Sequence, residues 1–160
     1  MTDLTVTLRP GRPEDADALG AVMFTAIRSG HSPYSDAQRA AWLPTPNSGD
    51  AWRARLGGQD VIVAEDKAGP VGFMTLSPAG YIDLAYILPP ARGRGVFDRM
   101  LHRIEADAKT AGLRRITTHA SLMAEPAFSR HGYRIVQRET VIRDGQSLDR
   151  AKMSKRLEET

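Results

Sequence analysis

Residues Ile82 to Gly112 read IDLAYILPPARGRGVFDRMLHRIEADAKTAG and predict a strand, a glycine-containing turn and a long helix. Residues 82–88 are rich in branched and aromatic side chains, which is typical of a strand. The two prolines that follow end it, because proline cannot donate to a β-ladder. From Phe97 onward, apolar residues recur at helical spacing along one stripe. Gly112 is placed to end that helix.

The turn contains two glycines, Gly93 and Gly95, directly before the helix. Glycine lets backbone N–H groups approach an anion without a Cβ in the way, and the helix dipole adds roughly half a positive charge at that end. We therefore predict a cradle for a pyrophosphate, formed mostly by the backbone N–H groups from Arg92 to Phe97. Arg92 and Arg94 could add charge-assisted contacts to phosphates, or they are exposed arginines that favour solubility.

The segment LPPARGRGV at residues 88–96 resembles the acetyl-coenzyme A motif of the GNAT N-acetyltransferase superfamily, whose core is Arg/Gln-x-x-Gly-x-Gly/Ala. Arg92 fills the first position and Gly95 a glycine-bearing one. Phe97 stands where the family usually has Gly or Ala, so its ring must fit near the pyrophosphate or turn into the core. The resemblance extends from about Leu8 to Val141. It implies that acetyl-coenzyme A is the cofactor and that these residues contact it: Ile87, Leu88, Arg92, Gly93, Arg94, Gly95, Val96, Phe97 and Phe128.

The resemblance also implies the fold, an α/β (α+β) domain with a central, mixed, mostly antiparallel twisted sheet of about seven strands flanked by about four helices. The sequence predicts strands at 5–9, 61–65, 71–76, 82–88, 115–121, 133–142 and 149–157, and helical segments at 12–30, 35–42, 50–56, 97–111 and 124–131. An antiparallel meander that leads into the glycine turn argues against a dinucleotide-binding unit, which needs Gly-x-Gly-x-x-Gly after a first parallel strand. We expect one domain spanning residues 1–160.

Composition excludes several kinds of site. The chain contains no cysteine, so disulfides, thiolate metal sites and a cysteine nucleophile are excluded, and its four histidines show no ligand spacing, so no metal is predicted. We expect a cytoplasmic protein, since no secretory signal is visible and no apolar stretch approaches the ~20 residues of a membrane span.

The charge differs between the two halves of the chain. Residues 1–83 hold 7 Lys/Arg against 10 Asp/Glu (net −3), and residues 84–160 hold 15 against 9 (net +6). The basic half favours a phosphate-bearing coenzyme, with nucleic-acid binding or a solvated surface as alternatives.

Acetyl transfer to an amine needs a group that accepts the amine proton, and Asp83 is the candidate for this catalytic role. By the two-residue period of a strand, Tyr81, Asp83 and Ile87 share one face, so Asp83 points towards the cleft if Ile87 does. Burial there would raise the pKa of the Asp83 carboxyl group. Asp83 could equally hold a cationic substrate or cap a backbone group. Tyr81 is expected in the substrate pocket, near where some members of the resembled family carry their base, although a phenol is a poor base near neutral pH.

The leaving thiolate takes up a proton or departs unprotonated. In many members of the resembled family a tyrosine in the short helix after the fifth strand supplies that proton, and here Phe128 occupies the slot and has none to give. Ser121 is the second candidate catalytic residue, with His119, Ser129 or water as alternatives. In the resembled family the fourth strand binds the pantetheine arm through its backbone. Ile87 and Leu88 occupy those positions, and the Leu88 N–H is the candidate oxyanion donor.

Tyr34 and Trp42 lie in the irregular segment 31–58, which in the resembled family varies and helps to form the acceptor pocket. They are candidate walls of a substrate pocket together with Tyr81, or they are aromatic residues of a satellite core. With these two residues, the segment SLMAEPAF at 121–128 looks like a bacterial GNAT subgroup that carries Ala-Ser-x-x-Ala-x-Pro-x-Phe after the fifth strand. That subgroup does not supply a substrate.

The residues and the resemblance together predict an acetyl-coenzyme A-dependent N-acetyltransferase. It would move an acetyl group to a primary amine of a small molecule or peptide by direct attack in a ternary complex. No covalent intermediate is expected, since the chain has neither a cysteine nor an activated serine motif. The alternative is a non-catalytic acyl-coenzyme A-binding sensor or interaction module, which Phe97 and Phe128 favour. No nucleic-acid or membrane partner is expected, and a homodimer, common in the resembled family, is the open alternative to a monomer.

Overall fold

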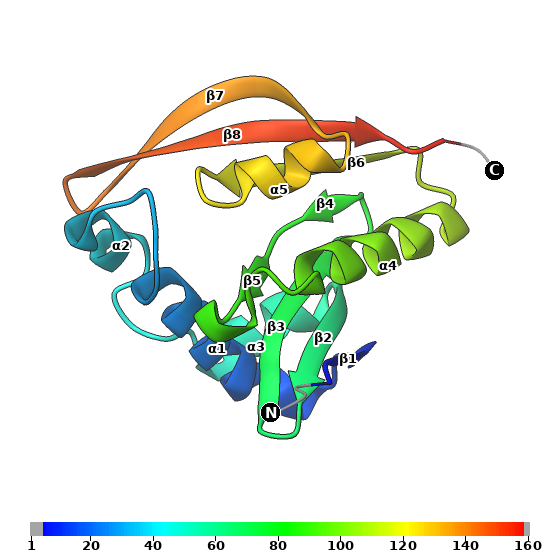
Figure 1. The fold of residues 1–160 in the computed structure, drawn as a ribbon, viewed down its shortest axis with the longest axis horizontal. Helices are drawn as coiled ribbons and strands as arrows, with labels where there is room; N and C mark the ends of the chain where they lie inside the picture. The colour runs from blue at the N-terminus through cyan, green and yellow to red at the C-terminus, as the bar shows by residue number, and fades with distance from the viewer. Residues whose placement is uncertain (1–4, 159–160) are drawn as a thin grey trace.

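The computed structural model describes residues 5–158, which form eight strands and five α-helices (Figure 1). In chain order the elements are β1 (Thr7–Pro10), the 3₁₀ helix η1 (Pro13–Asp15), α1 (Ala16–Arg28), α2 (Asp36–Trp42), α3 (Gly49–Gly57), β2 (Asp60–Asp66), β3 (Gly69–Leu76), β4 (Tyr81–Ile82), β5 (Ala85–Ile87), the 3₁₀ helix η2 (Pro89–Ala91), α4 (Val96–Thr110), β6 (Arg115–Ser121), α5 (Glu125–Arg130), β7 (Arg134–Arg143) and β8 (Gln146–Arg156). The mixed α/β fold class is confirmed, with one strand and one helix more than the approximate numbers expected. Among the helices of residues 5–158, none combines the length and the apolar character that a membrane span requires.

The first sheet is antiparallel and has the strand order β1-β2-β3-β5. Its central strands β2 and β3 are covered on both faces, which explains their nearly continuous apolar sequences. Val63 and Phe73, opposite each other in register, pack in one apolar cluster with α1 and α3. Their neighbours Ile62 and Met74 pack in a second cluster with α4. The sheet therefore lies between α1 and α3 on one side and α4 on the other (Figure 1).

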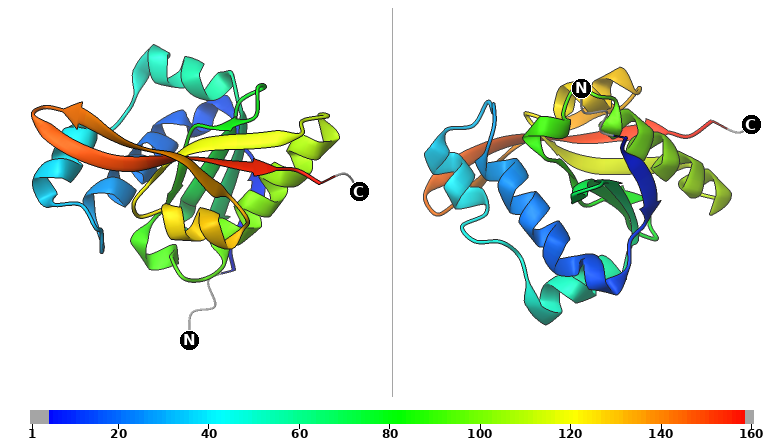
Figure 2. Two further views of the ribbon diagram at one scale, coloured as in Figure 1. Left: turned by 90° about the horizontal axis from the view of Figure 1, so that it is seen from above. Right: turned by 60° about the horizontal axis from the view of Figure 1, so that its bottom comes forward.

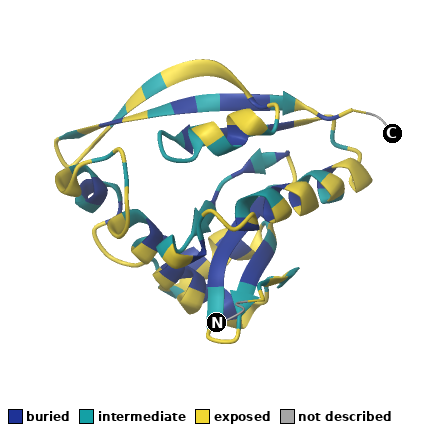
Figure 3. Cartoon of the chain, viewed as in Figure 1, coloured by how far each residue is buried: buried dark blue, intermediate teal, exposed yellow. Residues whose placement is uncertain are grey.

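The second sheet has the order β4-β6-β8-β7, with β4 parallel to β6 and the other pairs antiparallel. β7 and β8 form a long hairpin whose turn is Asp144-Gly145, both at positive φ, as is common in two-residue hairpin turns. The hairpin extends as far as α2, where the Gln38 side chain donates to the Ser147 carbonyl (Figure 2). β7 is an edge strand and most of its residues are exposed (Figure 3).

The predicted continuous strand 82–88 is wrong in one respect, because the structure divides it between the two sheets. β4 pairs with β6 of the second sheet, and β5 pairs with β3 of the first. The break falls at Asp83-Leu84, where the Leu84 N–H donates to Thr75 Oγ1 and the Leu84 carbonyl accepts from the Thr75 N–H. A threonine side chain thus replaces one ladder contact. The chain changes sheets at this point, and beyond it the two sheets separate.

Helix α4 follows the predicted stripe. Its first residue, Val96, comes directly after Gly95, and its buried face packs against the first sheet and consists of Val96, Met100, Leu101, Ile104 and Ala108. At the other end the Leu113 N–H donates to the Ala108 carbonyl across Gly112, which has φ +82°. This is the glycine-dependent termination that the sequence predicted. The amphipathic helix therefore presents its N-terminus at the place where the sheets separate.

Candidate active site

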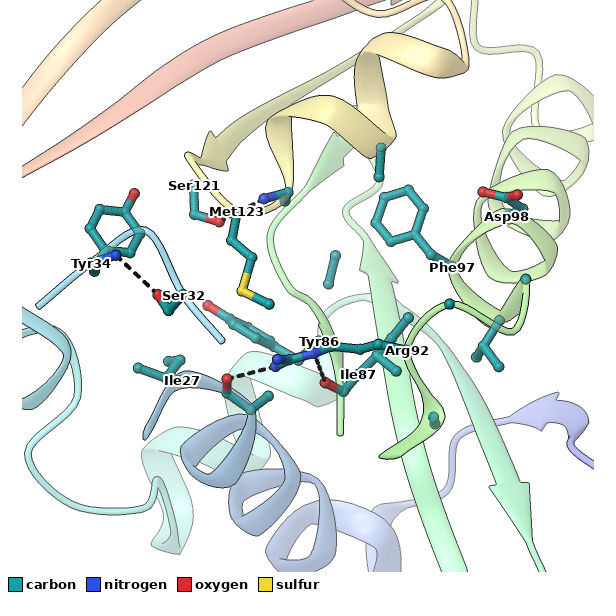
Figure 4. A pocket seen from close by; sticks show the side chains of 18 of the residues that line it. Ile27, Ser32, Tyr34, Tyr86, Ile87, Arg92, Phe97, Asp98, Ser121 and Met123 are labelled. Carbon is teal, nitrogen blue, oxygen red and sulfur yellow. Dashed lines mark hydrogen bonds between the residues drawn. The ribbon is translucent and has the colours of Figure 1, made fainter. Parts of the chain in front are cut away.

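A cavity of about 380 Å³ opens between the two sheets, beside β5 (Figure 4). One end is lined by the turn from Gly93 to Asp98 at the N-terminus of α4, and the other by residues of α1, α2 and the segment between them. The middle is walled by β5 and by the segment from Ser121 to Ala127, which joins β6 to α5. The cavity beside β5 thus runs from the N-terminus of α4 to a second, mainly aromatic chamber.

The turn before α4 has the geometry of an anion cradle. Gly93 and Gly95 adopt φ +75° and +78°, and a Cβ on either would meet no atom within 4 Å. Within residues 5–158, no hydrogen-bond acceptor is present for the N–H groups of Gly95 through Asp98. Four donors at a helix N-terminus, next to space that glycine keeps free, fit a diphosphate. The Arg92 N–H donates to the Pro89 carbonyl and does not belong to this set, so the predicted cradle is shorter by that residue.

The two arginines of the turn lie in different surroundings. The Arg92 guanidinium turns back under the cavity, donating from Nε to the Ile87 carbonyl (3.1 Å) and from Nη2 to the Ala26 carbonyl (2.8 Å) (Figure 4). Burial lowers the pKa of Arg92, and so does the nearby Arg39. Arg94 is exposed and lines a second cavity of about 280 Å³, beside the β2–β3 turn. Arg92 thus braces α1 against β5.

Phe97 lines the cavity at the cradle, and its ring also packs into the core. It meets the Phe128 ring edge to face at 5.1 Å, and Phe128 in turn meets Tyr133 at 5.1 Å. Phe128 is 1% exposed and does not line the cavity. Phe128 was predicted to contact the cofactor. It lies instead behind Phe97 and supports that ring. The bulky residue in the motif is accommodated by this aromatic stack.

The free backbone N–H at the edge of β5 belongs to Ile87 and not to Leu88, the residue that was predicted. The Leu88 N–H donates to the Val71 carbonyl at 2.8 Å, so it is not available as an oxyanion donor. Backbone groups alternate along a strand. The Ile87 N–H therefore points away from β3, on the side where Ile87 lines the cavity. Ile87 takes the place that the sequence analysis gave to Leu88.

Asp83 and Tyr81 do not line the cavity, because the strand break removes the common face that they were expected to share with Ile87. Both carboxylate oxygens of Asp83 accept from Arg55, and Gln59 Nε2 donates to one of them at 2.9 Å. The Arg55 hydrogen bond lowers the pKa of Asp83, opposite to the rise expected from burial. The Tyr81 hydroxyl is 2.7 Å from His119 Nδ1, in the second sheet.

The second chamber is lined by Tyr34, Trp42 and Tyr86, and by Met123, whose side chain projects towards Tyr86 (Figure 4). The Tyr34 hydroxyl accepts from the Leu122 N–H (2.9 Å) and donates to the Asp149 carbonyl, so it ties the α1–α2 segment to both β6 and β8. The ring centroids of Tyr34 and Trp42 are 5.6 Å apart. Burial raises the pKa of Tyr86 to about 12, so its hydroxyl stays protonated.

Ser121 lines the cavity where β6 ends, between the two chambers. Its Oγ accepts a hydrogen bond from the Ala124 N–H at 3.1 Å. A hydroxyl that accepts at its oxygen still has its own proton to donate.

The structure brings together Ser121, Ile87, the cradle, Tyr34 and Trp42, and leaves Asp83, Tyr81, Leu88 and Phe128 outside the cavity. The sequence analysis missed Tyr86, Met123 and Arg39. Tyr86 and Met123 lie inside the segments 82–112 and 121–128 that it singled out, and Arg39 carries no local signal.

Comparison with known proteins places this cavity in context. Residues 31–157 match the family described as acetyltransferase (GNAT) domain. The uncharacterised N-acetyltransferase YafP of Escherichia coli (strain K12) is 30% identical over 138 residues, 85% of this chain and 86% of YafP. A crystal structure from Rhodopseudomonas palustris, described as a GCN5-related N-acetyltransferase, is 34% identical with a TM-score of 0.87, covering 98% of this chain and 99% of the other. The fold is shared with yncA of Salmonella typhimurium, a putative acetyltransferase solved with its cofactor acetyl-CoA (TM-score 0.69, 18% identity, 98% and 96% coverage).

Proposed function

Since the chain belongs to the GNAT family of acetyltransferases, we propose that it moves an acetyl group from acetyl-coenzyme A to a primary amine of a small molecule or peptide, by direct attack in a ternary complex. Acetyl-coenzyme A is the cofactor of the family, and it supplies the acetyl thioester that the amine attacks. A new C–N bond forms as the C–S bond breaks, and the sulfur leaves as thiolate. The assignment to this chain is supported by the shape and the donor set of the cavity.

One observation carries the proposal: the cavity joins a set of unpaired helix N-terminal amides to an aromatic chamber along an exposed strand edge. The four free N–H groups from Gly95 to Asp98 suit the diphosphate of the coenzyme. The apolar wall formed by Ala85, Ile87 and Ala124 suits a pantetheine arm, and leads from the cradle towards Ser121. Coenzyme and acceptor would thus enter from opposite ends and meet beside Ile87.

At that meeting point the chain offers two donors. The Ile87 N–H would stabilise the negative charge that develops on the acetyl oxygen, since a fixed amide in a site with little water is worth far more than one in bulk solvent. The Ser121 hydroxyl would donate to the departing sulfur. Removal of one such oxyanion donor typically costs about 100- to 1,000-fold in kcat.

The cavity offers no ordinary general base near this point. The only carboxylate among the described residues that line it is Asp98, at the cradle, and it is paired with His131 (2.7 Å) and Arg130 (3.6 Å). Asp83 lies outside and is held by Arg55. We therefore propose that the acceptor reacts as the neutral amine, and that the proton it loses passes to water in the second chamber.

The test is thiol release from acetyl-coenzyme A across a panel of primary amines, with the acetylated product identified by mass spectrometry. The proposal predicts release that depends on the amine and matches product formation one to one. Binding of the coenzyme without turnover for any amine would instead support the non-catalytic sensor, which the buried Phe128 in the usual tyrosine slot favours.

A further inference from the structure

Two arginines form part of the wall of the cavity, and neither has a buried carboxylate as partner within residues 5–158. Arg39, on α2, is 9% exposed, and it donates from Nε to the Ile27 carbonyl (2.6 Å) and from Nη2 to the Gly30 carbonyl (3.1 Å). Arg92 donates to the carbonyls of Ala26 and Ile87. Each guanidinium thus spends two of its five N–H donors on carbonyls around the C-terminal end of α1 and the edge of β5.

The charge of the cavity is consequently positive. Among the described residues that line it, the ionisable cations are Arg39, Arg92 and Arg130, against the single anion Asp98, which Arg130 and His131 hold at the cradle. Among the described residues, the only acid within ion-pair distance of Arg39 is Asp36, at 3.8 Å and fully exposed, and such a contact is worth little. Arg92 has no acid within that distance in residues 5–158. Two like charges therefore face the cavity together.

The guanidinium groups of Arg39 and Arg92 lie near the proposed place of acetyl transfer and not at the glycine cradle. The Arg92 guanidinium is bonded to the carbonyl of Ile87, the residue whose N–H is assigned to the oxyanion. Arg39 is on α2, which also carries Trp42, and it lines the cavity together with Ser32 and Tyr34. The positive wall thus borders the second chamber, next to the place where the amine would attack.

Building on the function proposed above, we infer that the acceptor carries a carboxylate as well as its amine, and that Arg39 and Arg92 bind this carboxylate. Guanidinium groups pair with carboxylates through several N–H donors at once, which gives both affinity and orientation. An anion between the two arginines also relieves their mutual repulsion. The substrate class is therefore a small amino acid or a comparable amino-carboxylate. Asp83, the residue that could have held a cationic substrate, does not line this cavity.

The measurement compares pairs of acceptors that differ only at the anion, such as amino acids and their carboxamides, by kcat/KM with acetyl-coenzyme A. The wild-type protein should prefer the acid by at least about tenfold, the scale of one charge-assisted hydrogen bond. Arg39→Gln should abolish most of this preference and leave the Kd for coenzyme A unchanged. Arg28→Gln is the matched control: Arg28, in the last turn of α1, donates to the Leu43 carbonyl and does not line the cavity, so its removal should leave the preference intact.

Equal rates for acids and carboxamides with the wild-type protein would overturn the inference, whatever the variants show. A rise in the Kd for coenzyme A in Arg39→Gln with the acid preference retained would also overturn it, since the arginines would then serve the phosphates of the cofactor. If Arg39→Gln fails to fold, the inference is tested by the ratio of kcat/KM between acids and carboxamides, measured in the wild-type protein and in Arg39→Lys. If no amine is acetylated, the proposed function fails, and calorimetric binding of N-acetyl amino acids against their amides still tests the carboxylate site.

Discussion

The guanidinium of Arg55 holds both carboxylate oxygens of Asp83, at 2.8 and 2.9 Å. With Gln59 as a third donor, the pair lowers the pKa of Asp83, so this carboxylate is ionised throughout the neutral range. A group already ionised and hydrogen-bonded on both oxygens is a weak proton acceptor. The expected rise in the pKa of Asp83 is therefore wrong, because its ion pair with Arg55 lowers that pKa, and a role as base stays a prediction.

The first prediction concerns the pH dependence of the reaction. Because the described residues that line the cavity include no unpaired base, kcat/KM should rise with pH until the acceptor amine itself is neutral. The midpoint should move with the pKa of that amine from one acceptor to the next. Initial rates at several pH values, for two or three amines of different basicity, check this. A midpoint common to all of them would show that a group of the protein, such as His119, accepts the proton.

Asp83→Asn is expected to act on stability and not on chemistry. The folded-state pKa of Asp83 is lowered, so its pairing with Arg55 stabilises the fold above the unfolded pKa and this contribution is lost as the pH falls through the folded value. Since the pair is partly exposed, we expect the substitution to cost about 0.2–1 kcal/mol at neutral pH and less in acid. Chemical denaturation at pH 7 and pH 3.5 measures the difference. A loss of kcat of a hundredfold in a folded variant would restore Asp83 to the catalytic machinery.

Phe128→Tyr tests whether the usual tyrosine slot can supply a proton here. The Phe128 ring is 1% exposed between Phe97 and Tyr133, and it does not reach the cavity. An added hydroxyl would be buried among rings, so we expect a loss of about 1–3 kcal/mol in the free energy of unfolding and no gain in kcat. Thermal melts and steady-state rates measure both. An increase in kcat would mean that the helix α5 can turn this position towards the thiol.

Tyr34→Phe should weaken acceptor binding. The variant leaves the Leu122 N–H without its acceptor, and loosens the α1–α2 segment that walls the second chamber, so we expect a loss of about 1–3 kcal/mol in stability and a several-fold rise in the acceptor KM. Tyr133→Phe is the matched control, because it also deletes a hydroxyl hydrogen bond, to Glu105, but lies outside the cavity. An equal rise in KM for both variants would show that general destabilisation is responsible.

Much of the fold follows from local signals in the sequence. The helix from Val96, its buried stripe and its termination at Gly112 need only neighbours three to five residues away, and the structure matches the prediction closely. The division of the strand at Asp83-Leu84 depends instead on Thr75, which belongs to another strand. No two-residue period can reveal such a contact. The common face assumed for Tyr81, Asp83 and Ile87 was lost for this reason.

The site shows the same difference between local and long-range contacts. The glycine turn before α4 depends only on neighbouring residues, so its position was predictable from Gly93 and Gly95. The orientation of the Arg92 guanidinium depends on the carbonyl of Ala26, 66 residues earlier in the chain. Arg39 likewise joins the cavity only because the end of α1 is folded against it. The positive charge around the second chamber depends on these long-range contacts, so the sequence alone could not predict it.

The central claim, that the amides at the start of α4 hold the diphosphate of the coenzyme, is tested most directly by calorimetric titration of coenzyme A into three proteins. These are the wild type, Gly95→Ala and Gly112→Ala. The two glycines lie at opposite ends of α4 with φ of +78° and +82°, and a Cβ on either meets no atom within 4 Å, so the two substitutions carry a similar backbone strain of about 1 kcal/mol. We predict one site in the wild type, a Kd at least about tenfold higher for Gly95→Ala, and an unchanged Kd for Gly112→Ala. Equal affinities for the wild type and Gly95→Ala would contradict the claim.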